Sequence, residues 1–237
     1  MDTDLDKELK DKRNKASRFR QHVNPLSRKY QEPQVSSTDT SWVSTNFSDP
    51  TLPLHLDIGC AKGTFCLELA TQNPSSLNVL GLEIRSPVVD YALGRRDKRG
   101  LRNCHFLACN ANVDVGAVIE GVVENGGRVK TVSVQFPDPH FKKGQKKRRV
   151  VTPDFVRVLG DKLTSDKVGD EHIWLQSDVK DVLDDMRDAF REDERFIEMG
   201  EGGYWDNNWT GVPTEREISV FNKEEGGEVW RSLFKIK

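Results

Sequence analysis

A single carboxylate and a dense group of cations stand together in the stretch FPDPHFKKGQKKRR, residues 136–149. Asp138 lies between two prolines, and six cations follow it: Lys142, Lys143, Lys146, Lys147, Arg148 and Arg149. The chain of 237 residues has a formal net charge of −2, so this run is a local feature. A second basic stretch, residues 12–30, holds seven Lys or Arg and no acid. The two stretches indicate a polyanion site, with solvated charged loops as the plainer interpretation.

Residues suited to a nucleoside-type cofactor occur at three other places. In DIGCAKG, residues 57–63, Gly59 and Gly63 allow the backbone to pass close to a ligand. Glu83 comes 24 residues after Gly59, where a carboxylate can accept hydrogen bonds from both hydroxyls of a ribose. Asn110 and Ala111 end a third apolar run. The Asn side chain can bond the edge of adenine, and a backbone N–H can reach a ring nitrogen.

Two cofactors fit these three places, a nicotinamide dinucleotide and S-adenosylmethionine. The dinucleotide fingerprint G-x-G-x-x-G fails, because Ala61 and Thr64 stand where its second and third glycines belong. S-adenosylmethionine has no phosphate and carries a sulfonium and an ammonium cation. An acid beside the loop, Asp57, suits these charges and is included in the predicted cofactor site. The residues therefore favour S-adenosylmethionine.

Apolar runs and helical patterns alternate along the chain and place these residues. Strands are predicted at residues 52–59, 77–84, 104–109, 130–136, 172–177 and 228–236, and helices at 62–72, 86–100, 113–125, 153–163 and 178–190. This alternation predicts an α/β domain, residues 51–237, with a mainly parallel sheet. Ligands of such sheets bind beyond the carboxyl ends of the strands, where every motif above lies. Residues 1–50 lack the pattern and are predicted to form a flexible basic arm.

Composition excludes several classes of protein. The four cysteines form no CxxC pair, so neither a metal site nor a disulfide framework is predicted. No apolar stretch is long enough to span a membrane, and the acidic start MDTDLDKELK lacks the apolar region of a signal peptide. We therefore expect an intracellular protein of the cytoplasm or a plastid, with no membrane partner.

The stretch FPDPHFKKGQKKRRV resembles the hallmark of the tRNA (guanine-7-)-methyltransferases, F-P-D-P-x-x-K followed by K-R-R. Other stretches match the family in order: GLEIRSP (81–87), QSDVKDV (176–182) and TEREI (214–218). RQHVNP (20–25) resembles the segment before the fold in plastid and cyanobacterial members. The resemblance covers residues 18–237. It implies a Rossmann-like class I methyltransferase fold, with a mainly parallel seven-stranded sheet and helices on both faces.

The resemblance also implies an activity and a set of site residues. Members transfer a methyl group from S-adenosylmethionine to N7 of a guanine in the tRNA variable loop, usually at position 46. The catalytic aspartate of the family falls on Asp138. Substrate contacts fall on Lys142, Asp178, Thr214, Glu215, Arg216 and Glu217. Cofactor contacts fall on Gly59, Glu83, Arg85, Asn110 and Ala111.

The chemistry of guanine is consistent with a lone acid at the head of a basic run. N7 has a free lone pair and no proton, so no general base is obligatory. An acid can instead accept from the N–H groups of the guanine, fix its orientation and stabilise the cationic product. Asp138 is assigned this role, with Phe136 or Phe141 stacking on the base. The cations downstream are expected to hold phosphates.

Other interpretations stay open at this point. DPHF also resembles the D-P-P-(Y/F) motif of exocyclic amine methyltransferases, and a non-catalytic RNA-binding partner with a degenerate cofactor site is a further alternative. Thr214 and Glu217 fit the capping box T-x-x-E, and Asp178 fits a helix N-cap. The sequence leaves open whether the chain acts alone, as a homodimer or with a partner subunit.

Overall fold

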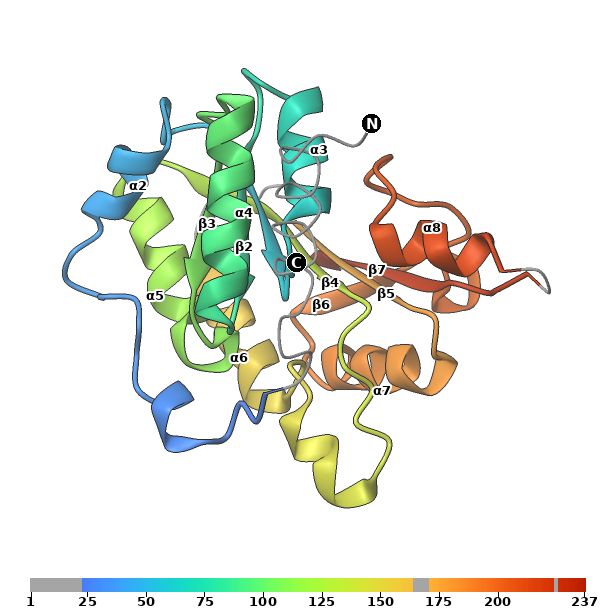
Figure 1. Ribbon diagram of the computed structural model, residues 1–237. Coiled ribbons are helices and arrows are strands. Elements are labelled where there is room, and N and C mark those ends of the chain that lie inside the picture. Colours follow the sequence, from blue (N-terminus) through green and yellow to red (C-terminus); the bar gives the residue numbers. More distant parts are fainter. Residues whose placement is uncertain (1–22, 164–170, 224–225) are drawn as a thin grey trace, which may run out of the picture.

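A seven-stranded sheet with helices on both faces forms the centre of the protein (Figure 1). The computed structural model describes residues 23–163, 171–223 and 226–237. The strand order is β3-β2-β1-β4-β5-β7-β6, in which β1 to β5 pair in parallel and β7 is antiparallel to both of its neighbours. The strands are β1 (Pro53–Ile58), β2 (Asn78–Glu83), β3 (Cys104–Ala108), β4 (Arg128–Gln135), β5 (His172–Ser177), β6 (Phe196–Met199) and β7 (Trp230–Ile236). This is the predicted class I methyltransferase architecture.

The helices connect the strands and cover the two faces of the sheet. They are α2 (Ser41–Asn46), α3 (Thr64–Gln72), α4 (Ser86–Arg99), α5 (Ala111–Glu124), α6 (Pro153–Leu163), α7 (Lys180–Arg191) and α8 (Glu215–Phe221). Their ends follow from local residue types. Helix α4 has Pro87 in its first turn and stops at Gly100, whose φ of 64° is left-handed. The capping box of Thr214 and Glu217 starts α8.

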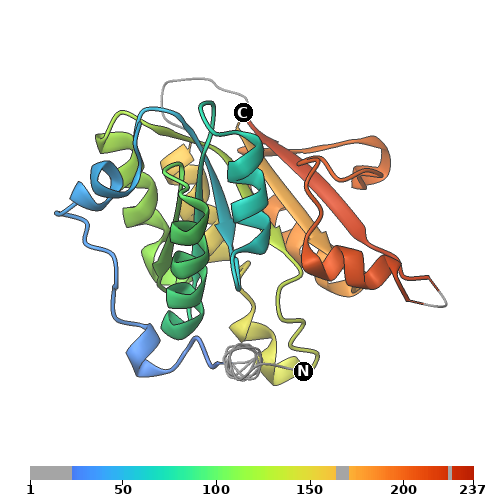
Figure 2. The same cartoon turned by 45° about the horizontal axis from the view of Figure 1, so that its top comes forward.

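The alternating direction of side chains along the strands divides the apolar core into two clusters, one on each face of the sheet. Leu54, Leu56 and Ile58 of β1 are buried in one cluster with α5, α6 and α7. The second cluster holds Val79 and Phe106 with α3 and α4. Because successive side chains of a strand point to opposite faces, β2 supplies both clusters, with Leu80 and Leu82 in the first and Val79 in the second. Figure 2 shows α3 and α8 on the same side of the sheet.

The predicted strands and helices match the structure with shifts of a few residues at their ends. One strand, β6, was not identified from its sequence. It has only four residues and pairs antiparallel with β7 at the edge of the sheet. So short a run of FIEM carries little periodic signal, and its pairing with β7 decides its conformation. Helix α5 begins at Ala111 and not at residue 113, because Asn110 caps it by accepting a hydrogen bond from the Asn112 N–H.

The first part of the predicted arm, residues 1–22, lies outside the described residues. The rest, residues 23–50, runs along the outside of α4 and α5 (Figures 1 and 2). Val43 and Phe47 are buried in the main core. Asp114 of α5 accepts hydrogen bonds from the backbone N–H groups of residues 34 and 35, at 2.8 and 3.1 Å. These contacts fasten residues 34–47 to the sheet-covering helices.

A chain of buried polar side chains crosses the sheet from β1 to β5. His55 Nε2 lies 2.8 Å from the Ser133 hydroxyl, which donates to Asp57 Oδ1 at 2.6 Å. The same carboxylate oxygen accepts from Gln135 Nε2 at 3.0 Å, and Gln135 Oε1 accepts from Gln176 Nε2 at 2.8 Å. Since Ser133 donates to Asp57, it accepts from His55, which therefore carries a proton on Nε2. Burial raises the pKa of Asp57 and lowers that of His55 to about 3.

The depressed pKa of His55 predicts loss of stability in mild acid. The unfolded chain binds a proton at His55 below about pH 6.5, while the folded protein does not. The contribution of His55 is therefore complete above pH 6.5 and is lost as the pH falls towards 3. We expect about 2 kcal/mol of the free energy of unfolding to be lost from pH 7 to pH 5 through this group. Urea denaturation at both pH values should show a smaller loss for His55→Gln. An equal loss in both proteins would contradict the assignment.

Candidate functional site

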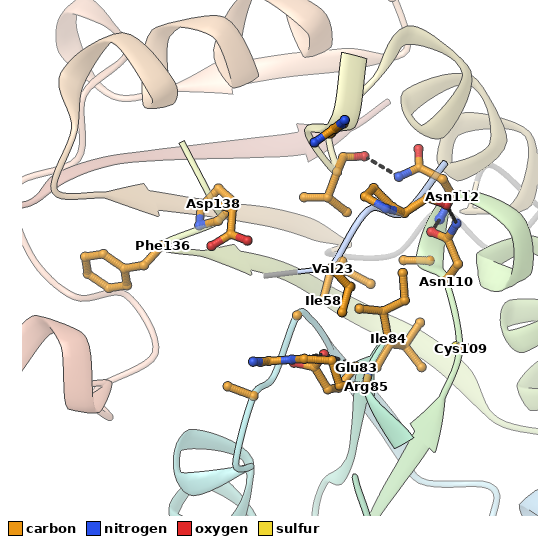
Figure 3. Close-up of a pocket in the computed structure, with 18 of the residues that line it drawn as sticks. Val23, Ile58, Glu83, Ile84, Arg85, Cys109, Asn110, Asn112, Phe136 and Asp138 are labelled. Atoms are coloured by element: carbon orange, nitrogen blue, oxygen red, sulfur yellow. Dashed lines mark hydrogen bonds and ion pairs between the residues drawn. The ribbon is translucent and has the colours of Figure 1, made fainter. Parts of the chain in front are cut away.

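A cavity of about 290 Å³ opens at the carboxyl ends of β1, β2, β3 and β4 (Figure 3). Its walls come from four strand ends, the segment before the fold and the loop after β4. The lining includes Val23, Pro25, Gly59, Ala61, Glu83, Arg85, Asn110, Ala111, Gln135, Asp138, His140 and Arg148. Neighbouring parallel strands end at one edge of the sheet, so residues that are far apart in the sequence meet there.

The loop after β1 leaves room for a ligand. Gly59 has a φ of 78°, and a Cβ placed on it would meet nothing within 4 Å. Gly63 has a φ of 70°, but a Cβ there would lie 2.5 Å from the ring of Phe106. The first glycine thus faces open space in the cavity, whereas the second is needed for packing against β3. Asp57, at the start of this stretch, is buried and does not line the cavity.

Glu83 and Arg85 form a two-pronged ion pair on one wall of the cavity. Glu83 Oε1 accepts from Arg85 Nε at 2.9 Å and from the Arg85 backbone N–H at 3.0 Å. Glu83 Oε2 accepts from Nη2 at 2.9 Å. Hydrogen bonding to Glu83, together with the charges of Glu83 and Asp138, raises the pKa of Arg85. Arg85 therefore orients the carboxylate that was predicted to bind a ribose.

Asn110 fastens the wall formed by the N-terminal segment. Its Nδ2 donates to the carbonyl oxygens of Tyr30 at 2.9 Å and Pro25 at 3.3 Å, and its Oδ1 caps α5. These bonds bring Val23 and Pro25 into the cavity lining. No local pattern predicts this role of Asn110, because its partners lie 80 and 85 residues away in the sequence. Binding of adenine by the Asn110 side chain stays a prediction, and its amide nitrogen is already engaged.

Asp138 lies across the cavity from Asn110, with Glu83 and Arg85 on a third side (Figure 3). The residues before and after the Pro-Asp-Pro triplet, Phe136 and His140, have φ values of 50° and 43°. Left-handed backbone at two residues without a Gly is strained and is retained only where the surroundings fix it. Figure 3 shows the Phe136 ring directed away from Asp138. Phe141 is 70% exposed, which leaves it available for stacking.

The other predicted substrate residues lie outside the cavity lining. Lys142 is exposed in the loop after Asp138. Asp178 pairs with Arg216 at 2.5 Å. Thr214 and Glu217 form the capping box, and buried Glu217 also pairs with Arg231 at 2.7 Å. Glu215 accepts a hydrogen bond from Thr64 at 2.9 Å. Their contact with substrate remains a prediction, but each of the four residues 214–217 already has a protein partner.

The basic run after Asp138 divides into groups with different surroundings. Arg149 donates to the Pro139 carbonyl through Nε at 2.9 Å, and both Arg149 and Lys146 pair with Asp185. These bonds close the loop onto α7. Arg148 lines the cavity, and its buried Nε has no hydrogen-bond partner in the described part of the protein. Lys147 is exposed, like Lys142. The sequence predicts phosphate contacts for Lys146, Lys147, Arg148 and Arg149 alike, although their surroundings differ.

The chain is similar to proteins named tRNA (guanine-N(7)-)-methyltransferase. The protein from Synechocystis sp. is 43% identical over 91% of this chain and 96% of its own length. That from Thermosynechococcus vestitus is 44% identical over 92% of this chain and 94% of its own, and that from Microcystis aeruginosa is 40% identical over 93% and 98%. Each of these similarities covers more than nine tenths of this chain.

Two broader comparisons agree on the fold. A family model described as "Putative methyltransferase" matches residues 51–231. The crystal structure of the 16S rRNA methyltransferase KamB has a TM-score of 0.50 at 14% identity and covers 86% of this chain and 95% of its own. An antibiotic-related methyltransferase gives 0.50 at 13% identity, with coverage of 87% and 96%. At this identity the solved structures support the fold alone.

We expect Glu83→Ala to weaken binding of S-adenosylmethionine, because the ribose hydroxyls lose their acceptor. A hydrogen bond to a charged group contributes about 1.5–3 kcal/mol, so the dissociation constant should rise about tenfold or more. Isothermal titration calorimetry measures this directly. Glu68→Ala, which removes a half-exposed acid paired with Arg99 on the outside of α3, is the matched control. Unchanged affinity in Glu83→Ala would remove Glu83 from the cofactor site.

Proposed function

The chain belongs to the tRNA (guanine-N(7)-)-methyltransferase family, and we propose that it methylates N7 of guanine 46 in the variable loop of tRNA with S-adenosylmethionine. One observation carries the assignment of residues. Asp138 lines the same cavity as Gly59 and Glu83, so an acceptor base beside Asp138 would face the cofactor. The predicted catalytic aspartate therefore shares one space with Gly59, Glu83, Asn110 and Ala111 of the predicted cofactor site.

The residues around the cavity fit S-adenosylmethionine. The space beside Gly59 receives a ligand without a Cβ in the way, and Glu83 is held by Arg85 in one orientation. Glu83 would accept from the ribose hydroxyls, and the backbone at Ala111 would meet the adenine ring. When bound, S-adenosylmethionine supplies a methyl group on a positively charged sulfur. The acids around the cavity stabilise a ligand of this charge.

Asp138 has the right charge and position for the acceptor base. N7 of guanine supplies the electron pair of the new bond and loses no proton, so Asp138 need not act as a base. Its carboxylate would accept hydrogen bonds from the N–H groups of the guanine and so orient N7. It would also stabilise the positive charge that the purine gains. The strained backbone at Phe136 and His140 supports this role, because such strain is retained only where the surroundings hold the Pro-Asp-Pro triplet in place.

The exposed part of the basic run would bind the tRNA backbone. Lys142 and Lys147 are exposed outside the cavity lining, and Phe141, next to Lys142 in the chain, has a largely exposed ring. Cations hold phosphates without reading sequence, while an aromatic ring can stack on an unpaired base. No described helix is long and apolar enough to cross a membrane. We keep the cytoplasm or a plastid as the proposed compartment, because both contain tRNA.

Incubation with unmodified tRNA and labelled S-adenosylmethionine tests the proposal. The expected product is 7-methylguanosine alone, found by nucleoside analysis and located in the variable loop. A label on adenosine or cytidine would support an exocyclic amine as the acceptor. Cofactor binding without any transfer to RNA would favour a non-catalytic RNA-binding protein.

Asp138→Asn keeps the shape of the side chain and removes its charge. We expect kcat to fall by about 100-fold or more, because a preorganised charge at the reacting base is lost. The affinity for S-adenosylmethionine should stay within about twofold of wild type. Single-turnover measurements at saturating tRNA separate the chemical step from binding. A wild-type rate under these conditions would mean that Asp138 is structural.

The lysines of the basic run have different surroundings, so replacing them should affect the salt dependence of tRNA binding differently. Replacing exposed Lys142 and Lys147 by Ala should reduce the slope of log K against log salt by about 0.7–0.9 for each lost phosphate contact. Lys146→Ala is the control, since Lys146 pairs with Asp185 at 2.9 Å, and its slope should change less. Filter binding at several salt concentrations measures the slopes. Parallel lines for the wild type and the double variant would show that neither lysine touches RNA.

A further inference from the structure

A hydrogen-bonded bridge connects the cofactor loop to helix α8. The Thr64 hydroxyl donates to Glu215 Oε1 at 2.9 Å, across 151 residues of sequence. Arg95 of α4 donates through Nη1 to the same hydroxyl at 2.7 Å and to the Lys62 carbonyl at 3.0 Å. A hydroxyl both donates and accepts, so Thr64 can join the guanidinium to the carboxylate. Thr64 directly follows the Gly59–Gly63 loop and is the first residue of α3.

Helix α8 is fastened on a second side by the end of β5. Arg216 pairs with Asp178 at 2.5 Å, just beyond β5. Behind the helix, Glu217 pairs with Arg231 of β7. The start of α8 thus spans two strand ends, that of β1 through Thr64 and that of β5 through Asp178. Figure 2 shows α8 and α3 on one side of the sheet. Val212, just before α8, is buried in the same apolar cluster as Phe65 of α3. The Thr64–Glu215 bond adds a direct polar contact between the end of the cofactor loop and the predicted substrate segment 214–217.

We propose that Thr64 is a positioning residue that, through Glu215, couples an occupied cofactor cavity to tRNA bound beside α8. The proposal rests on the function given above. It adds Thr64, which acts on bound tRNA through Glu215 and the start of α8. A ligand beside Gly59 orders the loop and with it the Thr64 hydroxyl, which holds Glu215 and the start of α8 in place. By linkage, tRNA that stabilises the same position of α8 must tighten the cofactor site by an equal factor.

The exposure of the bridge suits a coupling role. Glu215 is exposed and Thr64 is half-buried, so water can replace their bond when α8 shifts. Such a bond can break and re-form, unlike the buried pair of Glu217 and Arg231. Ligands alter one another's affinity only through interactions that differ between two states. The Thr64–Glu215 hydrogen bond supplies such a difference, because it is formed in one state and broken in the other.

The test measures the affinity for S-adenosylhomocysteine with and without saturating unmodified tRNA. In the wild type, tRNA should lower the dissociation constant about fivefold or more. In Thr64→Val and in Glu215→Ala this factor should fall towards one, while the affinity for S-adenosylhomocysteine alone stays within about twofold. The double variant should be no worse than either single variant, because both remove one bond.

Two variants serve as controls. Thr64→Ser keeps the hydroxyl and should keep the wild-type factor. Thr71→Val removes a hydroxyl of the same helix that donates to the Leu67 carbonyl within α3, and it should also keep the factor. Thermal unfolding shows whether Thr64→Val is folded. If it is not, Glu215→Ala decides the question, since its side chain is exposed.

Two results would overturn the coupling. The first is a wild-type protein in which tRNA leaves the affinity for S-adenosylhomocysteine unchanged. The second is a wild-type factor in both Thr64→Val and Glu215→Ala. Failure of the proposed function looks different, since the wild type would then bind no tRNA or transfer no methyl group to it.

Discussion

The parallel pairing of β1 with both β2 and β4 is the constraint on which the site depends. Asp57 of β1 is in register with Gly81 of β2 and Ser133 of β4. This register brings the loop after β1, Glu83 at the end of β2 and the loop carrying Asp138 to one edge of the sheet. The buried bonds of Asp57 to Ser133 and Gln135 add side-chain contacts between β1 and β4 at that edge. A shift of one residue would move these side chains to the opposite face.

The acidic side chains in and below the cavity each have polar or charged partners. Asp57 lies below it, and the hydrogen bonds from Ser133 and Gln135 satisfy the carboxylate without a cation. Glu83 is paired with Arg85, which also feels the charge of Asp138. Each acid therefore has defined partners before any ligand arrives. Preorganised charges of this kind need no rearrangement when positive charge develops on a substrate, which is why such sites accelerate reactions.

The segments that complete the cavity come from outside the strand ends. Residues 23–35 are tied to α5 through Asn110 and Asp114, and the loop after β4 is tied to α7 through Asp185. Helix α8 is tied to the cofactor loop through Glu215. Apolar residues also join these segments to the core, namely Val35 and Val151 packed against the main cluster and Val212 in the second. Long-range polar bonds and apolar packing together therefore complete the cavity.

The sequence by itself determined the residue types and the order of the elements. Local patterns were enough to predict these features, because an apolar run, a glycine turn or a Pro-Asp-Pro triplet depends only on residues that are close in the chain. They placed Gly59, Glu83, Asn110 and Asp138 at strand ends, and the structure brings all four to one cavity. They also assigned the capping box at Thr214 and Glu217 as an alternative to substrate binding, and the structure contains that box.

Only the tertiary structure decided which partner each polar side chain has. It directs the Asn110 amide to the Tyr30 carbonyl, Glu215 to Thr64, and Arg148 into the cavity away from the exposed lysines. The partners in the Asn110–Tyr30 and Thr64–Glu215 hydrogen bonds lie 80 and 151 residues apart in the sequence. No local period or spacing encodes such pairs, because their geometry exists only after the sheet has brought distant strand ends within hydrogen-bonding distance.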